Sequence, residues 1–162
     1  MRIATWNINS LRLRMPMLGK IVEELEPDVV CLQEIKVEDG LFPAEDVRKL
    51  GFEHMLFRGM KGYNGVAILS HVPLVEMKKR QWCGKDDCRH LAAKLPDGTE
   101  LHNFYVPAGG DIPDPVENEK FAHKLAFIEE MADWFGSKRP AKRILVGDLN
   151  IAPFENDVWS HK

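Results

Sequence analysis

The segment Asp28-Val29-Val30-Cys31-Leu32-Gln33-Glu34 is the part of the sequence that says most about its architecture. Its unbroken apolar run, which includes two β-branched valines, predicts a short strand that is buried on both faces. The run ends on two polar residues, Gln33 and Glu34, so an acidic side chain lies at the carboxyl end of the strand. Binding sites in α/β folds form at this end of the strands. The segment therefore predicts an α/β fold and one acidic member of a functional site.

The residues around this strand predict a mixture of helices and strands. Residues 2–8 have the composition of a strand, and residues 15–26 carry apolar side chains at helical spacing, with Pro16 acceptable in the first turn and Pro27 ending the helix. The elements predicted after Glu34 are a short helix at 43–50, strands at 53–57, 65–70, 74–80 and 89–95, a helix at 121–135 and a last strand at 144–146.

The turn signal Pro96-Asp97-Gly98-Thr99 separates two strand-like segments, 91–95 and 101–106, which we expect to pair as a hairpin. Helices and strands that follow one another without strict alternation predict a mixed sheet or two packed sheets. We see no internal repeat and no linker, so we expect a single domain over residues 1–162.

Composition agrees with one soluble domain, since 44% of the 162 residues are hydrophobic and 29% are charged. The formal charge of -3 and the pI near 6.1 are unusual for a nucleic-acid-binding protein, which commonly carries a basic surplus. Contact with phosphates, however, needs basic residues only where they face the phosphates, and the net charge does not reveal such a local surplus. The net charge therefore does not exclude a nucleic-acid partner.

The three cysteines do not predict a disulfide framework, because their number is odd and Cys31 belongs to the apolar strand. A zinc site at Cys83, Cys88 and His90 would lack a fourth ligand, so ordinary thiols are the better interpretation. The sequence shows no apolar signal core and no membrane-spanning run. We therefore expect a cytoplasmic protein without a membrane partner or an obligate protein partner.

Polar clusters follow three of the predicted strands, at Trp6-Asn7-Ile8-Asn9, at Gln33-Glu34 and at Gly147-Asp148-Leu149-Asn150. Asp148 and Asn150 are two residues apart, so in extended chain their side chains point to the same side. Hard cations such as Mg²⁺ take oxygen ligands, commonly one or two carboxylates together with water and substrate phosphate. If the strand ends converge, the clusters predict a magnesium site suited to phosphodiester hydrolysis. Each cluster alone is equally consistent with a helix cap or a solvated turn.

Five motifs together resemble bacterial exonuclease III-type AP endonucleases of the endonuclease/exonuclease/phosphatase superfamily. In chain order they are MRIATWNINS at 1–10, LQEIK at 32–36, GYNGVA at 62–67, NFYVP at 103–107 and VGDLNIAP at 146–153. The resemblance implies a four-layered α/β sandwich of two packed mixed β-sheets flanked by helices. It also implies a Mg²⁺-dependent DNA repair enzyme, with Mn²⁺ as a substitute, that hydrolyses the phosphodiester 5′ to abasic sites and has 3′–5′ exonuclease activity on double-stranded DNA.

The resemblance also implies roles for individual residues. Glu34 is the principal metal ligand with Asn7 beside it, and Asp148 orients and deprotonates the attacking water. Asn150 positions Asp148 and stabilises the transition state, and a second metal at Asp148 and Asn150 is a variant of this scheme. Tyr105 lies near the scissile phosphate. The resemblance implies that Arg89 contacts DNA, and Lys36 could line the same face. Solvated surface charge explains either residue equally well.

Members of the family continue beyond this sequence into further strands and a terminal Asp-His pair of the active site. We therefore expect a C-terminally truncated domain without those strands, in which residues 157–162 open an unfinished helix and His161 does not replace the catalytic histidine. Two alternatives stay open: a catalytically incompetent fragment that still binds DNA, and a related phosphodiesterase acting on a phosphoinositide or sphingolipid.

Overall fold

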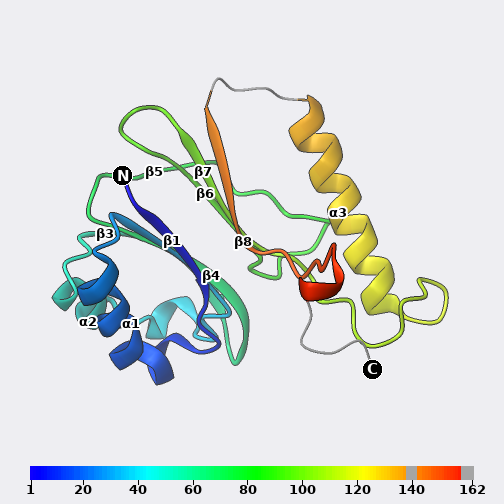
Figure 1. Ribbon diagram of the computed structural model, residues 1–162, viewed down its shortest axis with the longest axis horizontal. Helices are drawn as coiled ribbons and strands as arrows, with labels where there is room; N and C mark the ends of the chain where they lie inside the picture. The colour runs from blue at the N-terminus through cyan, green and yellow to red at the C-terminus, as the bar shows by residue number, and fades with distance from the viewer. Residues whose placement is uncertain (138–141, 158–162) are drawn as a thin grey trace.

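The computed structural model describes residues 1–137 and 142–157, which form two four-stranded β-sheets packed face to face (Figure 1). The first sheet has the strand order β1-β2-β4-β3, with β1 at Ile3–Asn7, β2 at Val29–Gln33, β3 at His54–Met60 and β4 at Tyr63–Ser70. The second has the order β5-β6-β7-β8, with β5 at Val75–Glu76, β6 at His90–Lys94, β7 at Glu100–Tyr105 and β8 at Arg143–Asp148.

Helices cover the outer face of each sheet. Helices α1 (Leu11–Leu25) and α2 (Ala44–Lys49) lie on the first sheet, and α3 (Glu119–Ser137) lies on the second (Figure 1). Two short 3₁₀ turns, η1 at Asp39–Leu41 and η2 at Glu155–Asp157, belong to the connections. The layers therefore run helix, sheet, sheet, helix, which confirms the predicted sandwich. In the part of the chain that the structure describes, no helix combines the length and apolar character needed to cross a bilayer.

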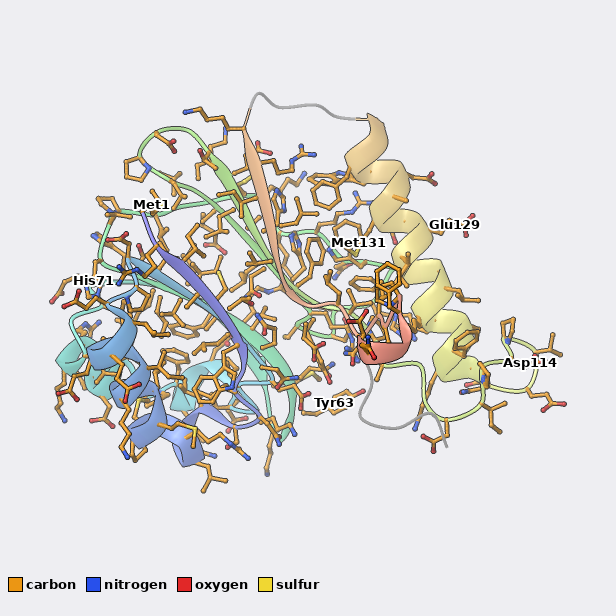
Figure 2. The ribbon with its side chains drawn as sticks, in the orientation of Figure 1. Met1, Tyr63, His71, Asp114, Glu129 and Met131 are labelled. Carbon is orange, nitrogen blue, oxygen red and sulfur yellow. The ribbon has the colours of Figure 1, made fainter. Side chains whose placement is uncertain are left out.

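The packing of strand β2 on both of its faces explains why its apolar run is unbroken. Its even-numbered residues Val30 and Leu32 pack into the cluster under α1 and α2, whereas Val29 and Cys31 pack into the cluster between the two sheets. Successive side chains of a strand point to opposite faces, so a strand covered on both sides needs apolar residues at every position. A third cluster, beneath α3, includes Trp82, Phe104 and Phe127. Met131 of α3 points toward this cluster and Glu129 points away from it (Figure 2).

Each sheet contains one parallel pair of strands joined by a helix. Strands β1 and β2 are parallel, with Asn7 opposite Gln33, and β7 and β8 are parallel, with Tyr105 opposite Asp148. Parallel strands end at the same edge of their sheet, and the packing brings β1 next to β8. The topology therefore gathers four strand ends in one place.

Two sequence predictions change in detail. The predicted strand at 74–80 shrinks to β5, because Lys79 and Arg80 leave the sheet to pair with Asp86 and Glu130. Helix α1 begins four residues earlier than predicted, but Arg14 has non-helical angles that divide it. Pro16 therefore lies in the first turn of the second segment, where it is tolerated. The predicted hairpin is confirmed, since β6 and β7 pair antiparallel. The predicted helix opening and His161 lie outside the described residues.

One buried amide ties the two sheets together. Asn103 of β7 donates from Nδ2 to the carbonyl oxygens of Leu32 and Ala67, both at 2.9 Å, and these residues belong to β2 and β4 of the opposite sheet. Its Oδ1 accepts a 2.6 Å hydrogen bond from Nε2 of Gln33, which lies at the end of β2. Because Asn103 and Gln33 are 0% and 1% exposed, these bonds have no competing water.

We expect Asn103→Ala to lower the free energy of unfolding by about 3 kcal/mol, because it leaves buried polar partners unsatisfied. Urea denaturation measures the change. A double-mutant cycle with Gln33→Leu should show a coupling of about 1 kcal/mol or more between the two positions. Additive effects of the two substitutions would show that this hydrogen bond does not connect the sheets energetically.

A buried histidine pair lies under α3. His90 Nε2 and His102 Nδ1 are 3.0 Å apart, and both rings stack on Phe104. Burial, with the neighbouring charges of His102 and two arginines, lowers the pKa of His90 to about 3 from 6.5. Burial also lowers the pKa of His102 to about 4. Because the unfolded chain binds protons that the folded chain excludes, stability is lost as the pH falls from 6.5 toward 4.

We expect the free energy of unfolding to fall by about 2 kcal/mol for each of these two histidines between pH 7 and pH 5. His90→Phe should remove about half of this pH-dependent loss, since Phe suits the aromatic surroundings. His71→Gln, a change at an exposed histidine, is the matched control and should keep the full loss. The same pH dependence in wild type and His90→Phe would contradict the assignment.

Candidate active site

The strand ends converge on a hydrogen-bonded group of four side chains. Asn7 ends β1, Glu34 follows β2, and Tyr105 and Asp148 end β7 and β8. Nδ2 of Asn7 donates to Oε1 of Glu34 at 2.7 Å and to Oδ2 of Asp148 at 2.7 Å. Tyr105 hydrogen-bonds to Glu34. One amide thus joins an acid of the first sheet to an acid of the second, as the convergence of the polar clusters predicted.

The chain leaving β2 adopts a special conformation that aims Glu34 into this group. Glu34 and Lys36 both have left-handed angles, with φ of 52° and 50°. Backbone bonds fix the exit, because Ser10 N donates to Glu34 O at 2.7 Å and Lys36 N donates to Asn64 O at 3.0 Å. Residues other than glycine rarely adopt this backbone conformation unless the surrounding structure imposes it. Such residues cluster at functional sites.

Gly147 explains the approach of Asp148. Its φ is 142°, and a Cβ at this position would lie 2.0 Å from the carbonyl oxygen of Phe104 on the neighbouring strand. Only glycine allows this contact, so the residue before Asp148 serves close strand packing. Asp148 is then held from two sides, because Asn150 N donates to its Oδ1 at 3.1 Å while Asn7 binds its Oδ2.

Asn150 lies beside Asp148, as predicted, but its side chain is occupied elsewhere. Its φ is 50°, and its Nδ2 donates to Val106 O at 2.8 Å. The backbone N–H of Asn150, rather than its amide, orients Asp148 in this structure. The backbone oxygen of Asn150 accepts a hydrogen bond from Lys124 of α3, which anchors the segment after β8.

Glu34 and Tyr105 differ in their tendency to hold a proton. Partial burial raises the pKa of Glu34, but hydrogen bonds from Asn7, Lys36 and Tyr105 outweigh it and lower the pKa below 4.5. Burial and the neighbouring Glu34 carboxylate raise the pKa of Tyr105 to about 12. At neutral pH Glu34 is therefore ionised, and Tyr105 keeps a proton that it donates.

The two cations predicted as DNA contacts have protein partners. Lys36 Nζ lies 2.9 Å from Glu34 Oε2 and 2.5 Å from Asn9 Oδ1, and its side chain is 29% exposed. Arg89 is only 7% exposed and binds Asp87 at 2.6 Å. Lys36 can reach a phosphate at the surface of the site, whereas Arg89 is enclosed. Contact of either residue with DNA stays a prediction.

Two residues that support the site, Asn9 and Asp87, were not predicted to do so from the sequence. Asn9 fixes the orientation of Asn7, since Asn9 N donates to Asn7 Oδ1 at 3.1 Å and thereby turns Nδ2 toward the acids. Its position two residues after Asn7 is the spacing of an Asx turn, which is a signal that the sequence does contain. Asp87 has no comparable signal, because its partner Arg89 becomes meaningful only beside Tyr105 in the fold.

The donor set suits a hard divalent cation. Two carboxylates, Glu34 and Asp148, meet at one amide, and Mg²⁺ commonly takes one or two carboxylates and completes its shell with water and phosphate. Within residues 1–137 and 142–157 no group of three or more His, Cys, Asp or Glu side chains could hold a metal, and Cys83 and Cys88 are not joined by a disulfide. Coordination by Asn7 requires its amide to turn, because the nitrogen faces the acids here.

We expect Asn7→Asp to make the stability of the chain depend on a divalent cation. A third carboxylate beside Glu34 and Asp148 should lower the free energy of unfolding by about 2 kcal/mol in EDTA, and millimolar Mg²⁺ should restore most of this loss. Asn7→Leu removes the same amide without adding charge, so Mg²⁺ should stabilise it far less. Thermal unfolding of both variants with and without Mg²⁺ measures the effect; an equal response of the two variants would count against a cation site.

Known proteins resemble this chain in both sequence and structure. Exodeoxyribonuclease III of Haemophilus influenzae is 30% identical over 98% of this chain and 60% of its own length. The structure of an AP endonuclease from Archaeoglobus fulgidus superposes with a TM-score of 0.87 at 35% identity, covering 99% of this chain and 62% of that one. A 3′ phosphatase from Neisseria, solved bound to a product DNA hairpin, gives 0.82 at 31% identity, covering 96% and 60%.

The chain spans about 60% of the length of these relatives. A model of the endonuclease/exonuclease/phosphatase family matches residues 4–162. The match runs through all four strand ends that form the site, and the fold is that of the solved AP endonuclease. The chain therefore belongs to the endonuclease/exonuclease/phosphatase family, with exonuclease III-type enzymes among its relatives.

Proposed function

We propose that these residues belong to a Mg²⁺-dependent DNA repair phosphodiesterase that hydrolyses the backbone 5′ to abasic sites and trims DNA from 3′ ends. The observation that carries the proposal is the amide of Asn7, which holds Glu34 and Asp148 2.7 Å from one nitrogen while Tyr105 contacts Glu34. Two acids and a phenol that are preorganised in this way suit cation-assisted phosphoryl chemistry, because the acids can hold a cation and the phenol can donate to an oxygen on which charge develops.

The surroundings of each residue determine which catalytic role it can take. Asp148 accepts two hydrogen bonds, from Asn7 and from Asn150 N, so its carboxylate is fixed in direction and can take a proton from an attacking water. Tyr105 retains its proton and can donate to a phosphate oxygen. Glu34 and Asp148 would hold the cation, and a bound Mg²⁺ neutralises phosphate charge and stabilises the leaving oxygen. Mn²⁺ has the same preference for oxygen ligands and should substitute.

DNA is the substrate class that the relatives support. These relatives include an exodeoxyribonuclease, an AP endonuclease and a phosphatase solved with a DNA hairpin. Lys36 is the described cation best placed to meet a phosphate at the site, since it lies beside Glu34 and is partly exposed. A second candidate function is DNA binding without catalysis by this chain alone, because the chain spans about 60% of its relatives.

The test compares an end-labelled duplex that carries one abasic-site analogue with an intact duplex, in Mg²⁺, Mn²⁺ or EDTA. We expect incision 5′ to the lesion in either metal, and a loss of at least about 100-fold in kcat for Glu34→Gln. Glu38→Gln makes the same change at an exposed glutamate nearby and should leave kcat unchanged.

Each outcome separates the candidates. Cation-dependent incision that Glu34→Gln abolishes supports the enzyme, and shortening of the intact duplex from its 3′ end supports the exonuclease activity. Binding of the duplex in fluorescence anisotropy without incision supports the second candidate for this chain. Neither binding nor incision, in a chain whose circular dichroism shows it to be folded, would overturn both.

A further inference from the structure

We propose that Asp87 is a positioning residue that holds Tyr105 in its working orientation through Arg89. The inference rests on the proposed function and adds to it a residue that does not touch the reacting atoms. Two observations support it. Arg89 lies at the site but is only 7% exposed, and a loop places Asp87 next to Arg89. This loop, residues 82–88, is called the Asp87 loop below.

Arg89 makes contacts in three directions. Its Nε donates to Asp87 Oδ2 at 2.6 Å, its Nη1 donates to the carbonyl oxygen of Tyr105 at 3.3 Å, and its Nη2 donates to Oη of Tyr63 at 3.3 Å. The guanidinium also lies over both aromatic rings, 4.7 Å from the centroid of Tyr105 and 5.9 Å from that of Tyr63. Arg89 therefore fixes the backbone and the ring of Tyr105 together.

Tyr63 is the solvent-exposed member of this group of three side chains. It is 56% exposed and lies at the end of the molecule where β1 and β8 finish (Figure 2). Arg89 lies against both rings, and the three side chains line the same pocket, so the planar guanidinium can set the orientation of both tyrosines. A flexible ammonium could not make the same set of contacts, because it lacks the planar fork of donors.

The Asp87 loop is anchored on several sides. Asn64 Nδ2 donates to the carbonyl oxygen of Asp87 at 2.8 Å, and Gly65 N donates to the carbonyl oxygen of Cys88 at 3.2 Å. Asp86 binds Arg58 and Lys79, each at 2.6 Å. At the other end of the loop, Cys83 N donates to Glu130 of α3 at 2.5 Å.

The backbone of this loop is strained where it meets Asp87. Cys83 and Cys88 have φ of 51° and 54°, a region that residues other than glycine rarely adopt. Such conformations persist only when surrounding contacts impose them, and they mark functional segments. Here the contacts hold one carboxylate against one buried guanidinium. A structural ion pair alone needs no such loop, since helices and strands provide simpler scaffolds.

Loss of the Asp87 charge would leave Arg89 buried without its counter-ion. A buried charge without a partner is costly, so the guanidinium would be driven toward water or another acid. The guanidinium would then leave Tyr63 and Tyr105, and the phenol would lose its fixed direction toward the substrate. Misplacement of a catalytic group lowers turnover more than it lowers binding.

Direct contact between Arg89 and DNA makes the opposite prediction. If Arg89 bound a phosphate, Asp87 would compete with that phosphate for the guanidinium. Removing the Asp87 charge would then tighten DNA binding and leave turnover intact. The sign of the effect on KM and on kcat therefore separates a positioning role from a DNA contact.

The kinetic test uses Asp87→Asn in the abasic-site assay, with Asp133→Asn as the matched control on the exposed face of α3. We expect Asp87→Asn to lower kcat at least about tenfold and to leave KM within about twofold. Asp133→Asn should change neither constant. An unchanged kcat with a lowered KM would overturn the positioning role and assign Arg89 to DNA.

A second readout does not depend on activity. The chain contains two tyrosines, Tyr63 and Tyr105, and Arg89 contacts both. With ring-labelled tyrosine, NMR spectra should show both ring resonances displaced in Asp87→Asn and neither displaced in Asp133→Asn. Unmoved resonances in Asp87→Asn would overturn the proposal. Because this result is read without substrate, it stands even if the wild-type chain fails to incise DNA and the proposed function fails.

Arg89→Lys covers the case in which Asp87→Asn does not fold. Lysine keeps the charge next to Asp87 but cannot contact both tyrosines, so the positioning role again requires displaced tyrosine resonances and a lowered kcat. Wild-type spectra and kcat in a folded Arg89→Lys chain would show that a simple charge pair suffices and would refute the proposal.

Discussion

The hydrogen bonds of Asn103 across the sandwich are the constraint on which the site depends. Apolar side chains fill the space between two sheets, but the hydrophobic effect is non-directional and specifies their alignment less sharply than a buried hydrogen bond does. Asn103 adds this specificity, because a buried amide must meet its partners in one geometry, and those partners lie on β2 and β4. Tyr105 lies two residues after Asn103 and Glu34 lies one residue after Gln33, so the bond that aligns the sheets also sets the distance between these two groups.

The two acids of the site are joined by an amide, which adds no charge between them, whereas Lys36 pairs with the outer oxygen of Glu34. A lysine or arginine between Glu34 and Asp148 would neutralise them and compete with a metal ion. Asn7 instead contributes two N–H donors without charge, and Asn9 keeps the amide turned in the right direction. Asn7 can therefore hold the carboxylates together before any cation arrives, and a cation that binds both acids displaces one neutral group.

Local patterns predicted the members of the site but not the contacts between them. The apolar run of β2 and the glycine before Asp148 placed Glu34 and Asp148 at strand ends, because strand period and burial are local properties. The role of Asn103 could not be predicted, because its partners lie far away in the chain and in the other sheet. Gln33 is 70 residues earlier and Leu32 is 71 residues earlier. Strand 74–80 was predicted too long because its basic residues find acids on α3 and in the Asp87 loop, which no local pattern reveals.

The ion pairs around the site explain how an acidic chain can suit a nucleic acid. Lys36 faces Glu34, Arg89 faces Asp87, and Arg58 faces Asp86, so the basic residues near the strand ends are largely neutralised by neighbouring acids. Under the proposed function, attraction for phosphate would then come mainly from a bound divalent cation, which reverses the local charge at Glu34 and Asp148. Affinity for DNA would follow the cation concentration, and the protein would need no basic surplus at a formal charge of -3.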